Sequence, residues 1–171
     1  MTDSLRIDPA TPVDVPLLVE FIRELAEYER LAHEVRAKEV LLHDALFGPR
    51  PVVEAIIARL GDEPAGWALY FHNFSTFLTR KGLYIEDLYV RPAKRGRGIG
   101  SRLLAELARI AIDRQCGRLE WTVLDWNEPA IRFYRSLGAE PMDGWTVHRV
   151  AGEPLRRLAA EVPEPRGNRG Q

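Results

Sequence analysis

Cysteine is nearly absent from this sequence, with Cys116 the only one among 171 residues. A single cysteine excludes an internal disulfide and a metal site built from several cysteines. The four histidines are scattered without the spacing of metal ligands: His33, His43, His72 and His148. We therefore expect no metal in this protein.

Long hydrophobic runs and a strong net charge are also missing. No apolar stretch approaches 18 residues, and the opening segment MTDSLRIDPA lacks the hydrophobic region of a signal peptide. We expect a cytoplasmic protein that does not bind membranes. The 24 basic and 25 acidic side chains give a net charge of −1, which does not favour nucleic acid as a partner.

Repeats and interdomain linkers are absent as well. Hydrophobic residues make up 46% of the chain and charged residues 29%, an ordinary composition for a soluble globular protein. The length predicts one domain over residues 1–160. Residues 161–171 are rich in Pro and Gly, and we expect this tail to be disordered.

The most informative stretch is a run of alternating glycines between a strand and a helix. It reads Arg95-Gly96-Arg97-Gly98-Ile99-Gly100 and continues into Ser101. Glycine lets the backbone approach a ligand closely, and a helix N-terminus favours phosphate. A tight connection between strand and helix would explain one glycine easily but three less well. The run therefore predicts a phosphate site.

Two common phosphate motifs do not fit these glycines. A P-loop requires Lys-Ser or Lys-Thr after its last glycine, and neither follows here. A dinucleotide-binding fingerprint requires G-x-G-x-x-G within alternating strands and helices, whereas this run is G-x-G-x-G.

Hydrophobic spacing predicts a mixed α+β order, β-α-α-β-β-β-α-β-α-β. The apolar positions favour strands at residues 5–7, 52–60, 66–74, 82–90, 118–123 and 145–150. Helices are expected from residue 12 or 14 to 28, from 38 to 46, from 99 to about 116 and from 127 to 137. Glu20, Glu24 and Glu27 lie off the apolar stripe of the first helix, and we expect them to face solvent.

The glycine run, with its flanking strand and helix, resembles the acyl-CoA pyrophosphate loop of the GNAT acetyltransferases. A second segment, Trp126-Asn127-Glu128-Pro129-Ala130-Ile131-Arg132-Phe133-Tyr134, is similar to a later motif of that family. A plain helix cap at Asn127 and a core aromatic at Tyr134 are the alternatives for each residue alone. The resemblance implies a GNAT fold, with a central antiparallel meander, a crossover helix and later strands, and acetyl-CoA as cosubstrate.

Further segments resemble the spermidine/spermine (diamine) and thialysine N-acetyltransferases, among them Glu24–Glu29, Tyr84–Leu88 and Gly144-Trp145. This resemblance implies Tyr134 as the acid that protonates the CoA thiolate, and Glu86 as the group that binds the amine and helps remove its proton. It implies a cofactor site formed by Leu88, Tyr89, Val90, Arg95, Gly96, Arg97, Gly98, Ile99, Gly100, Ser101 and Asn127. It implies an amine site lined by Tyr28, Glu29, Glu86, Asp87 and Asp143, and a homodimer.

The segment from Asn73 to Lys81 departs from the eukaryotic polyamine enzymes, because it contains two cations and no carboxylate.

Taken together, the motifs and the resemblance predict an N-acetyltransferase that acts by direct transfer on a small diamine, polyamine or thialysine-like amine. Acetylation of another amine, such as an antibiotic or a protein lysine, is an open alternative. A non-catalytic acyl-CoA-binding module is a third, although binding alone needs neither Glu86 nor Tyr134.

Overall fold

The computed structural model describes residues 4–161, which form two compact units: 4–127 and 128–161. The tail expected to be disordered lies outside the described residues except for its first residue, Glu161. The first unit contains β1 (Leu5–Pro9), α1 (Val15–Tyr28), α2 (Glu39–Phe47), β2 (Glu54–Leu60), β3 (Glu63–Ser75), β4 (Arg80–Val90), α3 (Ile99–Asp113) and β5 (Leu119–Trp121). Short 3₁₀ turns cover Pro12–Asp14, Ala32–Glu34 and Pro92–Lys94. The second unit contains α4 (Glu128–Ser136) and α5 (Gly152–Ala160).

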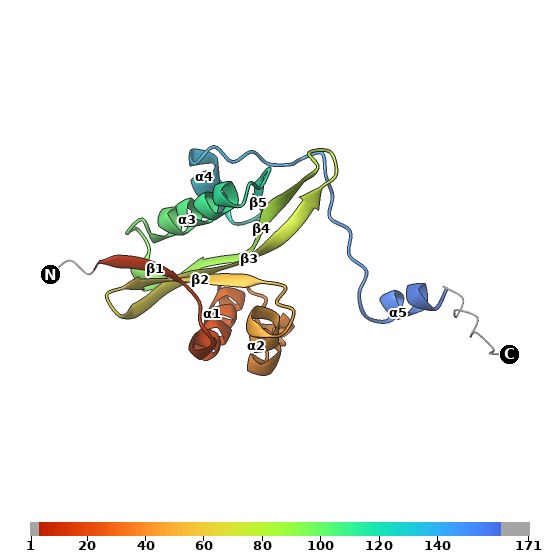
Figure 1. Ribbon diagram of the computed structural model, residues 1–171, viewed down its shortest axis with the longest axis horizontal. Coiled ribbons are helices and arrows are strands. Elements are labelled where there is room, and N and C mark those ends of the chain that lie inside the picture. Colours follow the sequence, from red (N-terminus) through yellow and green to blue (C-terminus); the bar gives the residue numbers. More distant parts are fainter. Residues whose placement is uncertain (1–3, 162–171) are drawn as a thin grey trace. The chain divides into compact units, whose positions relative to one another are not determined.

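The first unit is built on one five-stranded sheet in the order β1-β2-β3-β4-β5. The first four strands pair antiparallel, with short turns joining β2 to β3 and β3 to β4, while α1 and α2 lie between β1 and β2 in the chain. Strand β5 pairs parallel to β4 after the crossover through α3. Helices α1 and α2 cover one face of the sheet and α3 covers the other (Figure 1). This is the mixed α+β arrangement that the sequence predicted.

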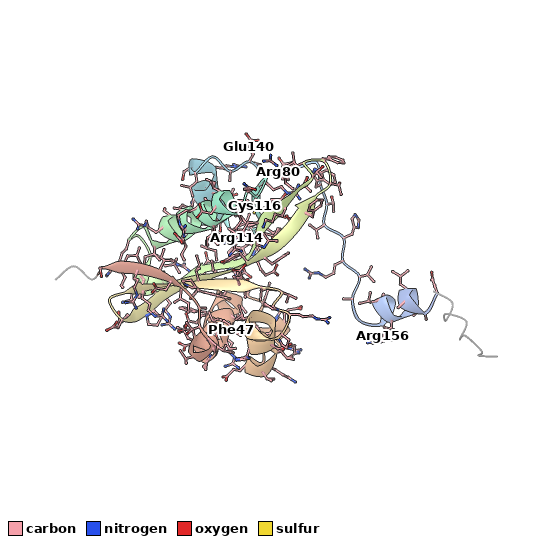
Figure 2. The ribbon with its side chains drawn as sticks, viewed as in Figure 1. Phe47, Arg80, Arg114, Cys116, Glu140 and Arg156 are labelled. Atoms are coloured by element: carbon pink, nitrogen blue, oxygen red, sulfur yellow. The ribbon has the colours of Figure 1, made fainter. Side chains whose placement is uncertain are left out.

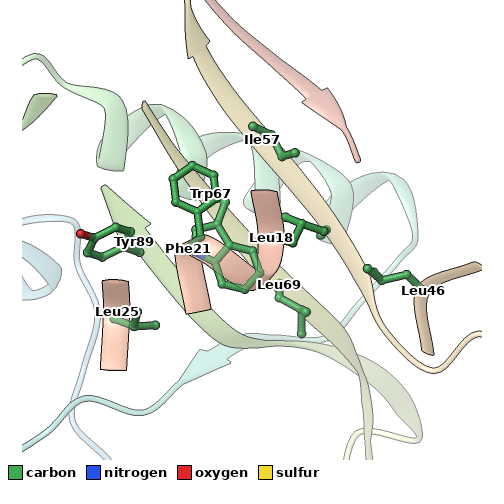
Figure 3. Close-up of a cluster of buried hydrophobic side chains, with 9 residues drawn as sticks. Leu18, Phe21, Leu25, Leu46, Ile57, Trp67, Leu69 and Tyr89 are labelled. Carbon is green, nitrogen blue, oxygen red and sulfur yellow. The ribbon is translucent and has the colours of Figure 1, made fainter. Parts of the chain in front are cut away.

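The main core lies between the sheet and α1 (Figure 3). Residues Leu18, Phe21 and Leu25 recur at helical spacing on α1 and face the sheet, while Trp67 and Leu69 alternate on β3 and face the helix. Phe21 stacks on Trp67 with ring centroids 6.1 Å apart and an interplanar angle of 7°. This packing fixes α1, and hence its C-terminal residues, against β3 and β4.

One irregularity in the sheet bears on function. Leu69 of β3 pairs with Asp87 of β4, but the next residue, Tyr70, pairs with Ile85. Glu86 is therefore an extra residue in β4, which is a β-bulge. Because alternation is interrupted there, Asp87 lies on the α1 face with Leu69, while Ile85 lies with Tyr70 on the α3 face.

Three details of the predicted elements are wrong. Residues 145–150 form no strand, and the side chains of Trp145 and Val147 are 74% and 80% exposed. Alternating apolar residues make a strand only where a neighbouring strand accepts their hydrogen bonds, and within residues 4–161 none pairs with this segment. Helix α5 was not predicted. The strand expected over residues 118–123 is also shorter, since β5 has only three residues.

Candidate active site

The glycine run lies where the sequence placed it, at the start of α3. Gly96 and Gly98 both have φ of +75°, in the left-handed region that favours glycine, and Gly98 is the N-cap residue of the helix. A β-carbon built on either residue would meet no atom within 4 Å. The space above these two residues is open, so a ligand can approach the backbone and the positive end of the α3 dipole.

The cations around this loop divide into two groups. Arg91 is bound to α1, because its Nη2 lies 2.7 Å from Glu24 Oε1 and 2.5 Å from Glu20 Oε1, while Lys94 pairs with Glu63. Glu20 faces solvent as expected, whereas Glu24 is half-buried beside Arg91. Among residues 4–161, Arg95, Arg97 and Arg102 form no ion pair. Arg95 donates a hydrogen bond to the Val90 carbonyl and lies over the Tyr28 ring, so Arg97 and Arg102 are the better placed to neutralise a phosphate.

Strand β4 has a half-open outer edge next to this loop. Its pairing with β5 covers only Leu83, Tyr84 and Ile85, so in the sheet of residues 4–127 the stretch from Glu86 to Val90 has a strand neighbour on the β3 side alone. Arg95 Nε donates a hydrogen bond to the Val90 carbonyl at 3.0 Å. The stretch contains Leu88, Tyr89 and Val90, and its free backbone groups can bind an extended ligand as an added strand would.

Three carboxyl groups gather beside this edge, Glu29 at the end of α1 and Glu86 and Asp87 on β4. Glu86 is exposed, whereas Asp87 is half-buried against the α1 face. Burial, with the negative charges of Glu86 and Glu29 added, raises the pKa of Asp87 to about 7. Burial also raises the pKa of Glu29. A cluster of this kind attracts a cation and can accept a proton near neutral pH.

Aromatic rings join the carboxylate cluster to the cofactor side. The Tyr28 hydroxyl donates a hydrogen bond of 3.3 Å to Asn127 Oδ1, and the Tyr28 and Trp126 ring centroids lie 6.1 Å apart. The guanidinium of Arg95 lies 4.5 Å from the centre of the Tyr28 ring, and that of Arg30 lies 5.4 Å from the centre of the Trp126 ring. The sequence placed Trp126 in the second motif without giving it a role in the site, and it did not single out Arg30.

Most of the predicted site lies within the first unit. Residues Tyr28, Glu29, Glu86 to Val90, Arg95 to Ser101 and Asn127 all belong to the first unit. Tyr134 lies on α4 and Asp143 in the loop that follows it, both in the second unit. The roles of these two residues stay predictions.

A cavity of about 520 Å³ lies elsewhere in the first unit, between β1, β2, α2 and the C-terminal half of α3. Its polar lining includes Glu54 and Arg114, which form an ion pair, while Phe47 is among its apolar residues. Figure 2 labels Arg114 and Phe47. None of the predicted site residues lines this cavity.

Among residues 4–161, no group of three or more His, Cys, Asp or Glu side chains is arranged to hold a metal. None of the described helices has the length and apolar character needed to cross a membrane.

Comparisons with known proteins agree with this geometry. Residues 18–139 match the acetyltransferase (GNAT) family. A thialysine N-epsilon-acetyltransferase of Bos taurus is 37% identical over 155 residues, covering 84% of this chain and 91% of that protein. An L-ornithine N5-acetyltransferase of Arabidopsis thaliana is 31% identical, with 90% of this chain and 87% of that protein covered.

A solved structure shows the same fold. An integron cassette protein from the mobile metagenome of V. cholerae superposes with a TM-score of 0.77 at 32% identity, covering 91% of this chain and 98% of that one. The glycine loop at the start of α3, the half-open edge of β4 and these relatives lead to one conclusion: the chain belongs to the GNAT family and is an N-acetyltransferase.

Proposed function

We propose that the protein transfers the acetyl group of acetyl-CoA directly to the primary amine of a small diamine or thialysine-like substrate. The observation that carries this proposal is the cluster of Glu29, Glu86 and Asp87 beside the half-open edge of β4. The edge offers backbone groups for the pantetheine arm, and the cluster offers negative charge for the ammonium group. The two substrates would meet where the cluster and the edge adjoin.

On the cofactor side, residues Gly96 to Ser101 would bind the pyrophosphate through backbone N–H groups, and Arg97 and Arg102 would add positive charge. Leu88, Tyr89 and Val90 would bind the pantetheine and acetyl carbonyl through their backbone, with Asn127 contacting the pantetheine arm. Arg95 already donates to the Val90 carbonyl and would compete with pantetheine for that acceptor.

On the amine side, Tyr28, Glu29, Glu86, Asp87 and Asp143 would surround the substrate. An alkylammonium has a reference pKa near 10.4 and must lose a proton before its nitrogen can attack. Glu86 would hold the ammonium and help remove that proton, directly or through water, and Tyr134 would protonate the leaving thiolate. Acyl transfer through Cys116 is disfavoured, because Cys116 lies beyond the far end of α3, roughly 22 Å along the helix from the glycine loop.

The charge around the amine site favours an amino-acid-like amine. Arg30 and Arg95 place guanidinium groups on the faces of Trp126 and Tyr28, next to Glu29. A substrate with a distal amine and an α-carboxylate would find both signs of charge there, whereas a long polycation would meet the two arginines. Relatives named for thialysine and L-ornithine act on amines of this class.

The deciding experiment is a turnover assay with acetyl-CoA, in which the released CoA thiol is measured against a panel of amines. We expect thialysine, L-ornithine and short diamines to exceed a monoamine of equal length, mainly through a lower KM, and spermine to gain little over a short diamine. An aminoglycoside and a lysine peptide test the alternative acceptors. Acetyl-CoA binding without turnover of any amine would favour a non-catalytic module.

We also propose that the protein is a homodimer, as its family resemblance implies. The second unit supports an apolar contact, because Trp145, Val147 and Val150 have exposed side chains. The cytoplasmic location is a prediction from the sequence alone.

A further inference from the structure

The bulge at Glu86 gives two neighbouring carboxylates different surroundings. Without the extra residue, Asp87 would lie on the same face as Ile85, which is 2% exposed on the α3 side. With it, Asp87 lies on the α1 face, opposite the apolar Leu69 and two residues from Tyr89. Glu86 remains exposed at the bulge itself. One carboxylate is therefore open to solvent and the other is sheltered.

A second carboxyl group from another element, Glu29, acts on the half-buried Asp87. Charged groups act on Asp87 from two elements, Glu86 on β4 and Glu29 at the C-terminal end of α1. Leu69, the residue opposite on β3, adds no charge. Two like charges close together in a partly desolvated place favour binding of one proton between them. The exposed Glu86 lacks this environment.

We propose that Asp87 is the proton acceptor of the reaction, with Glu29 as the residue that sets its basicity and Glu86 as the residue that holds the ammonium group. This inference rests on the function proposed above. It replaces the double role that the proposed function gives to Glu86: Glu86 keeps the task of binding the amine, and Asp87 takes the task of removing its proton. Asp87 is thereby a catalytic residue, and Glu29 is a positioning residue that acts through it.

An Asp87 oxygen takes one proton from R–NH₃⁺, which leaves a carboxylic acid and a neutral amine. The amine nitrogen then bonds to the acetyl carbonyl carbon, and the carbon–sulfur bond breaks with its electron pair on sulfur. The second nitrogen proton passes to the thiolate, giving amide and CoA thiol. Asp87 returns its proton to water, so each acetylation releases one proton.

The acidity of these groups agrees with the assignment. A proton acceptor works best when its pKa lies near the working pH, and burial raises the pKa of Asp87 to about 7. An ordinary carboxylate would be a far weaker base toward an ammonium. The negative charge of Glu29 contributes to the raised pKa, so neutralising Glu29 should lower it.

The test is the pH dependence of kcat/KM for the amine, measured with saturating acetyl-CoA. We expect a rise with pH whose midpoint lies near the pKa of Asp87, about 7. Glu29→Gln should move this midpoint to lower pH. The matched control is Glu27→Gln, which removes the same charge from an exposed position two residues away on α1 and should leave the midpoint unchanged.

Two substitutions on β4 separate the roles. Asp87→Asn should lower kcat by about 100-fold or more, abolish the rise of kcat/KM near pH 7 and leave the KM for acetyl-CoA unchanged. Glu86→Gln should raise the KM for the amine and retain the rise of kcat/KM near pH 7. If Asp87→Asn fails to fold, the shift caused by Glu29→Gln still decides the question.

The assignment would be overturned if the midpoint of the pH profile did not move in Glu29→Gln. It would also be overturned if the rise of kcat/KM near pH 7 disappeared in Glu86→Gln instead of Asp87→Asn. Either result would leave the acetyltransferase proposal intact. Absence of turnover in the unaltered protein with every amine, at every pH, would overturn the proposed function itself and the inference with it.

Discussion

A carboxylate held between a sheet and a helix costs folding free energy whenever it is charged. The pKa of Asp87 is raised from 3.8 to about 7 in the folded protein. The folded state therefore binds more protons than the unfolded state between these values, and stability falls as pH rises through this range. The penalty is fully present above the folded pKa and absent below the unfolded one.

We predict that Asp87→Asn raises the free energy of unfolding at pH 8, by at most about 4 kcal/mol, and changes it little at pH 4. Urea unfolding at the two pH values measures the difference, with the exposed Glu27→Gln as a control that should show a small effect at both. Equal destabilisation by Asp87→Asn at both values would mean that the side chain serves packing, with no buried charge to remove.

Tyr134 is the residue proposed to protonate the leaving thiolate. Tyr134→Phe should lower kcat about tenfold, less than the 10²–10⁴ typical of general acids, because a thiolate leaves with little help. Affinity for acetyl-CoA should barely change. Rate measurements with acyl donors of differing thiol acidity check this, since the loss should shrink as the thiolate leaves more easily. An unaltered rate under chemistry-limited conditions would leave Tyr134 with a packing role.

Among the elements, the loop before α3 combines glycines in left-handed conformations with an anchor at Arg91, where the loop begins. Gly96 and Gly98 provide the left-handed turns, while Arg91 at the end of β4 is bound by Glu20 and Glu24 and also stacks on Phe21 at 4.8 Å. The Arg91 N–H donates to the Ala65 carbonyl at 2.9 Å. The loop therefore starts from a fixed point.

We predict that Gly98→Val weakens acetyl-CoA binding at least tenfold, because it strains the φ of +75° and places methyl groups in the open approach to the helix N-terminus. Gly152→Val is the matched control. Gly152 has φ of +60° and equally open surroundings, but it lies at the start of α5. Calorimetric titration with acetyl-CoA distinguishes them, and equal affinities in both variants would remove the loop from the cofactor site.

The anchor of the loop gives a separate prediction. Glu24→Gln should lower the free energy of unfolding by about 1–3 kcal/mol and also weaken acetyl-CoA binding, because Arg91 loses the carboxylate that accepts three of its hydrogen bonds. Glu27→Gln on the same helix is the control and should do neither. Thermal unfolding and calorimetric titration provide the two readouts, and loss of stability with unchanged affinity would separate the anchor from the cofactor site.

The elements also show which features sequence patterns can predict. The glycine loop was predictable because its signal is local, with three glycines and a helix within ten residues. The bulge at Glu86 was not, because an extra residue in β4 is defined only by its pairing with β3. The contact of Arg91 with Glu24 joins positions 67 residues apart, and nothing local marks either residue for the other. The prediction of a strand at residues 145–150 was wrong for a related reason, because a strand also depends on a neighbouring strand to pair with.

At the scale of the whole molecule, the proposed homodimer is open to direct measurement. Light scattering at micromolar concentration should give about twice the 19.5 kDa mass of the chain. Val147→Glu should shift the mass toward a single chain by placing a charge among the exposed apolar side chains of the second unit. Ile112→Glu is the control, because Ile112 is similarly exposed on α3 in the first unit. A mass of one chain in the unaltered protein would refute the dimer.

Between Glu86 and Val90, strand β4 has a strand neighbour on the β3 side only, so a bound ligand can pair with its outer edge. Outward-facing amides between Glu86 and Val90 should exchange with deuterium faster than those of Leu83 to Ile85, which lie between two strands. If acetyl-CoA occupies that edge, its pantetheine serves as the missing half-strand and exchange there should slow. The cosubstrate would then be a structural part of the enzyme, and its concentration in the cell would set how firmly the end of β4 is held.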